Sequence, residues 1–168
     1  MTSVAVRVET PFQPYYLPLL WDWMDKFRHK VLDDDGPRDQ HAFVDLYIER
    51  LKGGDRTWSV KKDDRLVGFV QVSPANHHGL AETGSVWRQE DWSSKVVAPA
   101  LYQVYSEVFA AGVQKLHTTI YADFHAMADM LARVGFQCEG RLRKVRMRNG
   151  ELQDVKIFGL IKEELKAL

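Results

Sequence analysis

The stretch MADMLARVGFQCEGRLR, residues 127–143, decides the fold of this chain. Its first part spaces apolar residues by three and four positions, which is typical of a short amphipathic helix. Gly135 predicts the end of that helix, and the residues after it predict a strand. The run Arg148-Asn149-Gly150-Glu151 predicts a hairpin turn, and residues 154–161 predict the returning strand. The chain therefore ends in a helix, a strand, a turn and a strand.

Apolar periodicity and turn residues predict the remaining elements. A strand over residues 4–9 precedes a helix over 15–31 and a second helix that Asp39 caps and Gly53 ends. Strands at 57–61 and 66–72 flank the turn residues Asp63 and Asp64. A strand over 80–87, a helix over 95–111 and a strand over 116–121 complete the order.

This order resembles the GNAT acyl-CoA N-acyltransferases, and in particular their ribosomal-protein alanine acetyltransferase branch. In that branch a helix ends in Gly-Phe, a Glu-Gly-x-Leu-Arg segment follows, and a hairpin closes the chain. The matching residues here are Gly135, Phe136, the run 139–143, Asp154, Phe158, Leu160, and Glu163 or Glu164. The resemblance implies one α/β domain over residues 1–168, with a mixed central sheet of six to seven strands flanked by about four helices.

Composition narrows the class of protein. The 168 residues suit one domain, and 23 basic side chains balance 23 acidic ones, so no net field favours nucleic acid or an acidic membrane. The single cysteine, Cys138, excludes an internal disulfide, and we expect it to be a small buried strand residue. The first ten residues lack the apolar core of a signal peptide, and no run reaches the roughly 20 apolar residues of a membrane span. These features predict a soluble cytoplasmic protein.

The resemblance implies acetyl-CoA as co-substrate, with its pyrophosphate at the N-terminus of the helix after strand four. The family carries a glycine-rich Q/R-x-x-G-x-G/A loop there, whereas residues 91–98 of this chain, DWSSKVVA, contain no glycine. One interpretation gives phosphate binding to the hydroxyls of Ser93 and Ser94, the ammonium of Lys95, and the N–H groups of Lys95, Val96 and Val97. The alternative is an ordinary helix, capped by Asp91 or Ser93, that no longer binds the cofactor.

Further contacts follow from the same resemblance. Backbone N–H groups at the end of strand four, at Val86 and Trp87, would polarise the thioester carbonyl, and Trp92 would stack near the cofactor. Phe124 stands where many relatives have an asparagine that reaches cofactor or substrate. Leu131 stands where many relatives have a tyrosine that acts as the acid for the departing thiolate.

An attacking ammonium must lose a proton, and a carboxylate on strand four is the usual base in relatives that use one. Glu82 occupies such a position, although a solvated carboxylate at the start of a strand is the simpler interpretation. His125 is a second candidate base, and His77 or His78 a third. The His77-His78 pair is weak evidence for a metal, because neighbouring strand side chains point to opposite faces, and we predict no metal.

The only dense basic run lies at residues 141–148. Strand alternation would place Arg141 and Arg143 on one side and Lys144, Arg146 and Arg148 on the other, as on an exposed strand protected from aggregation by charge. Contact with nucleic acid, or with an acidic partner such as a ribosomal surface, is the alternative, and the lack of interleaved aromatic residues disfavours it.

The predicted function is transfer of an acetyl group from acetyl-CoA to a primary amine, on a protein N-terminus or a small molecule, by direct attack in a ternary complex. The alternative is a non-catalytic interaction protein of the same fold. No membrane partner is expected, and a homodimer remains an open alternative.

Overall fold

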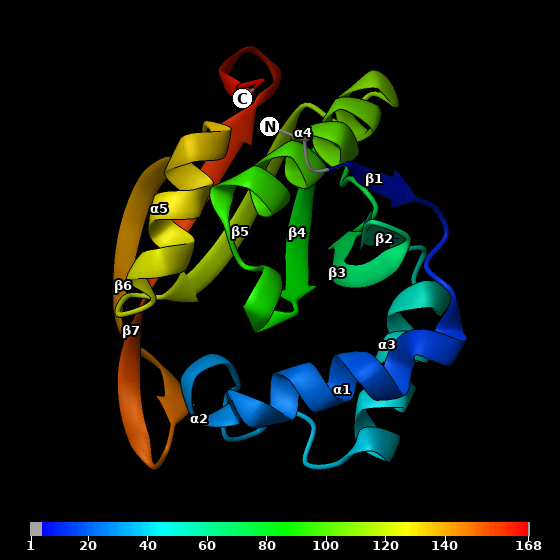
Figure 1. Cartoon of the computed structure of the whole chain (residues 1–168). Helices are drawn as coiled ribbons and strands as arrows, with labels where there is room; N and C mark the ends of the chain where they lie inside the picture. The colour runs from blue at the N-terminus through cyan, green and yellow to red at the C-terminus, as the bar shows by residue number, and fades with distance from the viewer. Residues whose placement is uncertain (1–4, 168) are drawn as a thin grey trace.

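The computed structural model describes residues 5–167 and contains one mixed sheet with the strand order β1-β2-β3-β4-β5-β7-β6 (Figure 1). The strands are β1 (Val6–Glu9), β2 (Arg56–Lys62), β3 (Arg65–Val72), β4 (Leu80–Trp87), β5 (Lys115–Tyr121), β6 (Gln137–Arg148) and β7 (Glu151–Ile161). Within residues 5–167, β4 and β5 form the only parallel pair, and the other neighbouring strands are antiparallel. The predicted order of the strands along the chain is confirmed. Val4, the predicted first strand residue, lies outside the described residues.

Helices cover both faces of the sheet (Figure 1). They are α1 (Leu17–Lys26), α2 (Arg28–Val31), α3 (Gln40–Lys52), α4 (Ser94–Ala110) and α5 (His125–Val134), with 3-10 segments at Pro14–Tyr16, Gln89–Asp91 and Lys162–Glu164. One apolar core joins the sheet to α4 and α5, and a second joins it to α1 and α3. In residues 5–167 we find no helix with the length and apolar character that crossing a membrane requires.

Two local predictions in the N-terminal half are confirmed, and one is wrong. The Asp39 carboxylate caps α3 by accepting the Ala42 N–H at 2.8 Å, and Asp63 and Asp64 adopt positive φ in the β2–β3 turn. The single helix predicted over residues 15–31 is divided at Phe27, whose φ of −117° ends α1 before α2 begins. No glycine or proline marks this break, so the spacing of the apolar residues predicted one continuous helix.

The strands β4 and β5 pair over only part of their length. Their register joins Leu80 to Lys115, Ala81 to Leu116 and Glu82 to His117, and ends there. Beyond this point the two strands spread apart (Figure 1). An opening between neighbouring parallel strands exposes backbone groups at their carboxyl ends, where open α/β sheets bind ligands.

The decisive C-terminal stretch folds as predicted. Gly135 has a φ of +120°, and a side chain at this position would collide with the carbonyl of Glu164. The tail passes directly over the glycine, because the Lys166 N–H donates to the Val134 carbonyl at 2.9 Å. Asn149 and Gly150 form the predicted turn, with φ of 53° and 76°. Glycine is required at residue 135 for both its conformation and its lack of a side chain.

Strand β6 departs from the predictions in two ways. Lys144 has a φ of 53° at an irregularity between Leu142 and Arg146, so the basic residues do not alternate as a regular strand would place them. Three arginines of the basic run make internal ion pairs: Arg141 with Asp154, Arg146 with Asp33, and Arg148 with Asp123. Cys138 is exposed instead of buried.

Candidate active site

The turn between β4 and α4 presents backbone N–H groups to solvent. Ser93 is the N-cap of α4, and its carbonyl accepts the N–H groups of Val96 at 3.1 Å and Val97 at 2.9 Å. The N–H groups of Ser93, Ser94 and Lys95 have no partner within the described part of the chain. Three free donors at the positive end of a 17-residue helix suit an anion.

This geometry corrects part of the expected donor set. The N–H groups of Val96 and Val97 are engaged inside the helix, and both side chains are buried, so the free donors lie earlier in the turn. The side chains of Ser93 and Lys95 are exposed and that of Ser94 is half-buried. The hydroxyl of Ser93 makes no capping bond, and Asp91 does not cap the helix either. The helix start therefore lacks an internal ligand for its free amides.

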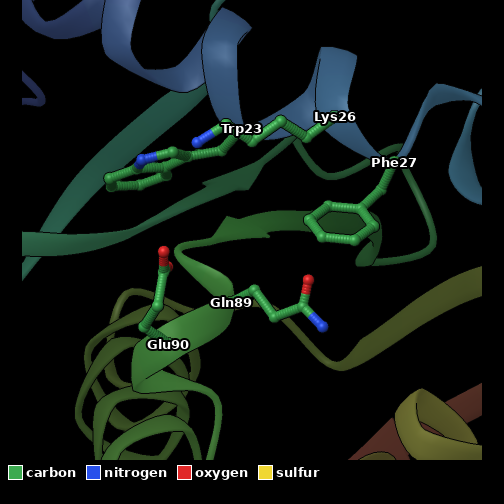
Figure 2. Close-up of a pocket in the computed structure, with 5 residues that line it drawn as sticks. All are labelled: Trp23, Lys26, Phe27, Gln89 and Glu90. Atoms are coloured by element: carbon green, nitrogen blue, oxygen red, sulfur yellow. The ribbon is translucent and has the colours of Figure 1, made fainter.

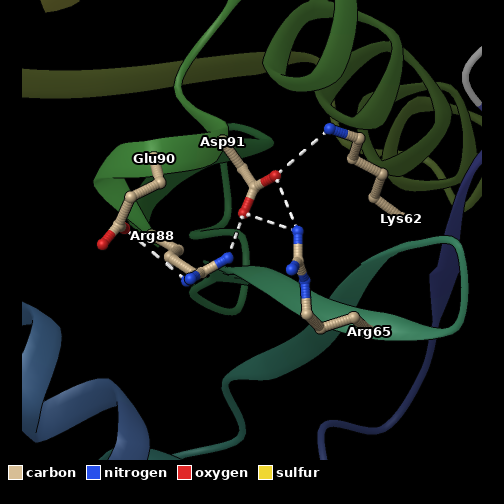
Figure 3. A network of polar contacts seen from close by, with 5 residues as sticks. All are labelled: Lys62, Arg65, Arg88, Glu90 and Asp91. Atoms are coloured by element: carbon tan, nitrogen blue, oxygen red, sulfur yellow. Dashed lines mark hydrogen bonds and ion pairs between the residues drawn. The ribbon is translucent and has the colours of Figure 1, made fainter.

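Asp91 instead lies at the centre of an ion-pair network (Figure 3). Its carboxylate is 3% exposed and forms ion pairs with Lys62 at 3.3 Å, Arg65 at 3.2 Å and Arg88 at 3.0 Å. Arg88 also pairs with Glu90 at 3.5 Å. Three cations against two carboxylates leave one positive charge beside the turn.

The network controls the ionisation of Asp91. Burial alone would raise the pKa of its carboxyl, but hydrogen bonds from Lys62 and Arg88 and the charge of Arg65 outweigh burial and lower the pKa below its ordinary value. Asp91 is therefore charged at neutral pH and ties the end of β4 to the β2–β3 hairpin.

Aromatic packing fixes the other side of the turn. Gly68 on β3 leaves room for the Trp87 ring, which would collide with any side chain there. The Trp87 indole N–H donates to the Ser85 hydroxyl at 2.8 Å, and the ring meets Trp92 edge-on with centroids 6.4 Å apart. Both tryptophans are half-buried and pack against the core, as does the half-buried Val86 against the α1 side.

The carboxyl end of β5 carries Phe124, which is the half-buried N-cap of α5. It lies across the β4–β5 opening from the Ser93–Lys95 donors, because both segments follow the carboxyl ends of the diverging strands. Leu131 is buried in the core on α5 and offers no acid.

Glu82 lies in the last register pair before β4 and β5 separate. Its neighbours Ala81 and Thr83 face α4, so the exposed Glu82 side chain projects on the α1 side of the sheet. Its partner across the strands is His117, and adjacent parallel strands run about 4.8 Å apart with paired side chains on one face. The register thus places a carboxylate and an imidazole side by side.

The other candidate bases lie elsewhere. His125 is exposed in a cavity of about 300 Å³, beyond the far end of β5 from the Glu82–His117 pair. His77 and His78 stack on each other 3.7 Å apart before β4, at the opposite end of that strand from the free amides. None of these three histidines is the register partner of Glu82, which is His117.

A larger cavity, of about 320 Å³, lies between α1 and the β4–α4 turn. Figure 2 shows Trp23 and Phe27 projecting from the helical side and Gln89 and Glu90 from the turn. Lys26 completes the lining. The cavity thus joins two aromatic walls, one carboxylate, one amide and one ammonium.

Sequence reasoning missed three of these features. The first is the pairing of His117 with Glu82 in the β4–β5 register. The second is the ion-pair network of Asp91, whose cations come from three different segments of the chain. The cavity depends on how α1 lies over the turn. No local sequence pattern carries such long-range information. The one available signal was Asp91 itself, a charged residue within the stretch predicted to bind phosphate.

No three His, Cys, Asp or Glu side chains in residues 5–167 are placed to hold a metal ion. The expectation of a metal-free site stays a prediction.

The sequence of this chain matches a known protein family. A sequence model described as "Acetyltransferase (GNAT) domain" matches residues 22–157. The uncharacterized N-acetyltransferase YoaA of Bacillus subtilis (strain 168) is 30% identical over 125 residues, which cover 72% of this chain and 69% of that protein.

Solved structures agree at the level of the fold. Spermidine N-acetyltransferase from Vibrio cholerae, in complex with CoA and spermine, superposes with a TM-score of 0.79 at 16% identity over 98% of each chain. Mycobacterium smegmatis RimJ, in complex with CoA-disulfide, gives a TM-score of 0.78 at 18% identity over 98% of this chain and 86% of that one. The chain belongs to the GNAT acetyltransferase family of enzymes.

Proposed function

We propose that this enzyme transfers an acetyl group from acetyl-CoA to a primary amine. The free N–H groups of Ser93, Ser94 and Lys95 carry the proposal, because they offer an anion three unengaged donors beside the β4–β5 opening. The ammonium of Lys95 and the surplus positive charge around Asp91 add attraction for phosphate. A charge network and two serines would thus replace the glycine-rich loop.

The reaction needs few groups from the protein. The amine nitrogen attacks the thioester carbon, a C–N bond forms, the C–S bond breaks, and coenzyme A leaves as the thiol after taking up a proton. Glu82, next to His117, would accept the proton that the ammonium must lose before attack. Holding the two reactants together supplies most of the acceleration.

Within this proposal the whole chain acts as one cytoplasmic domain, and the acceptor is a small-molecule amine or a protein N-terminus. Family membership and the acetyltransferase relatives favour an enzyme over the non-catalytic alternative. The exposed basic strand gives no reason to invoke nucleic acid, because three of its arginines are paired.

Calorimetric titration with acetyl-CoA, and separately with desulfo-coenzyme A, tests the proposal directly. We expect micromolar binding of both ligands, because the pyrophosphate end does not involve the thioester. Lys95→Glu should weaken both affinities about tenfold or more by repelling phosphate, with unchanged thermal stability. Lys52→Glu, on the exposed end of α3, is the matched control. Absence of binding at millimolar ligand would overturn the assignment.

A further inference from the structure

The cavity beneath α1 has a composition that selects a ligand. Trp23 is 7% exposed and Phe27 is half-buried, and both rings line the cavity. Opposite them stands the Glu90 carboxylate (Figure 2). Aromatic faces and a carboxylate together favour a cation attached to an apolar body.

Glu90 is available for such a ligand. Its side chain is 63% exposed, and its only ion pair within the described residues is with Arg88 at 3.5 Å. A solvent-exposed pair of this length contributes little to stability, so exchanging it for a ligand cation costs little. Asp91, by contrast, is buried among three cations and cannot serve.

The cavity does not contain the proposed reaction centre. Its lining comes from α1, Phe27 and the β4–α4 turn, and includes neither Glu82 nor any residue of β5. A ligand group held here is therefore not the amine that attacks the thioester. The turn nevertheless joins the two regions, because Gln89 and Glu90 directly precede the segment that carries the free amides.

We propose that this cavity binds the non-reacting end of the acceptor, and that the preferred acceptor is a diamine with one distal cation on an apolar chain. Glu90 pairs with that cation, and Trp23 and Phe27 enclose the adjoining carbons. Glu90 is the only carboxylate of the lining, and Lys26 repels additional positive charge. A third ammonium on the acceptor would therefore add no binding energy in this cavity. The inference rests on the proposed function, whose acceptor it specifies.

Matched pairs of amines test it. Diamines from 1,4-diaminobutane to 1,8-diaminooctane are compared with monoamines of equal carbon number, which differ only in the distal ammonium. For the best chain length we expect kcat/KM to be about tenfold higher for the diamine, mainly through KM. Spermidine should show no further gain.

Variants assign the effect to the cavity. Glu90→Gln should raise KM for the diamine about tenfold and leave the monoamine unchanged, because only the distal charge loses its partner. Lys26→Met should lower KM for the diamine and for spermidine. Glu163→Gln, on the exposed 3-10 segment after β7, is the control. Equal rates for diamine and monoamine, or an equal effect of Glu90→Gln on both, would overturn the proposal.

Failure of the inference and failure of the proposed function remain distinguishable. Titration of the same amines into the coenzyme A complex, and into the protein alone, measures distal recognition without turnover. Acetyl-CoA binding without diamine preference contradicts only the cavity assignment. Loss of acetyl-CoA binding contradicts the proposed function, while a Glu90-dependent preference for the diamine would still support the cavity.

Discussion

The phenol hydroxyl of Tyr121 donates a hydrogen bond to the carboxylate of Asp33, which joins the end of β5 to the segment after α2 across 88 positions of sequence. Burial first, and then the negative charge of Asp33, raises the pKa of Tyr121, so the phenol stays protonated and keeps donating. The Arg148 guanidinium lies over the Tyr121 ring, 4.2 Å from its centroid. Asp34 continues the attachment by accepting the N–H groups of Asn149 at 2.7 Å and Gly150 at 2.8 Å.

Replacing Tyr121 with phenylalanine should lower the free energy of unfolding by about 1 to 2 kcal/mol, because a bond to a charged acceptor is lost while water partly replaces it. Urea denaturation measures the change. Tyr102→Phe is the control, since Tyr102 on α4 makes no side-chain hydrogen bond within the described residues. Equal stabilities of the two variants would show that the Asp33 contact contributes nothing.

Gly68→Ala should destabilise the protein by about 1 to 3 kcal/mol, because the added methyl group displaces the Trp87 ring in a packed region. Gly140→Ala provides the comparison, because nothing lies within 4 Å of the added carbon at residue 140. We expect that second change to stay within about 0.5 kcal/mol. Thermal unfolding of both variants, with tryptophan fluorescence, decides whether Trp87 needs the glycine.

Asp91→Asn should cost about 3 kcal/mol at neutral pH, because three cations lose their buried counter-charge. Folding lowers the pKa of Asp91, so its stabilisation is complete above the ordinary value of 3.8, decreases as the pH falls below 3.8, and is lost once the pH has fallen through the lower folded value. The difference between wild type and variant should therefore be equal at pH 7 and pH 5, and shrink below about pH 4.

The control for Asp91 is Asp64→Asn. Asp64 also pairs with an arginine, Arg7, but its side chain is 79% exposed, so the change should cost under about 1 kcal/mol. Chemical denaturation across this pH range measures both. A cost at residue 91 no larger than at residue 64 would mean that burial adds nothing to the network.

Glu82→Gln should reduce turnover most strongly at acidic to neutral pH, where a general base matters most, and leave acetyl-CoA affinity within about twofold. Steady-state rates from pH 6 to pH 9, with Glu163→Gln beside them, measure this. An unchanged profile would remove Glu82 from the mechanism and direct attention to His117.

Most of the fold was predictable because its signals are local. Gly135, the Asn149-Gly150 turn and the Asp39 cap each act within a few residues, and the structure has all three where the sequence predicts them. The break at Phe27 and the irregularity at Lys144 were not predictable, because neither carries a glycine or proline. Both lie beside segments that are distant in sequence. Phe27 lines the cavity that also contains Gln89 and Glu90, and Arg146 on β6 forms an ion pair with Asp33.

The site was predictable only in outline. The stretch 91–98 was identified as the phosphate segment by resemblance, but which amides are free depends on the carbonyl of Ser93, and that required coordinates. Cys138 illustrates the opposite error. An apolar-looking residue on a strand was expected to be buried, yet β6 is the edge strand of the sheet and turns that side chain outward.

The outward position of Cys138 gives the chain a natural attachment point. Because it is the single cysteine of the sequence and lies on the surface, a maleimide fluorophore would label each molecule once without any substitution. The dye would report from the far edge of the sheet, two strands from the β4–β5 opening, because β7 and β5 lie between. Energy transfer from the tryptophans beside the opening could then follow ligand entry in real time.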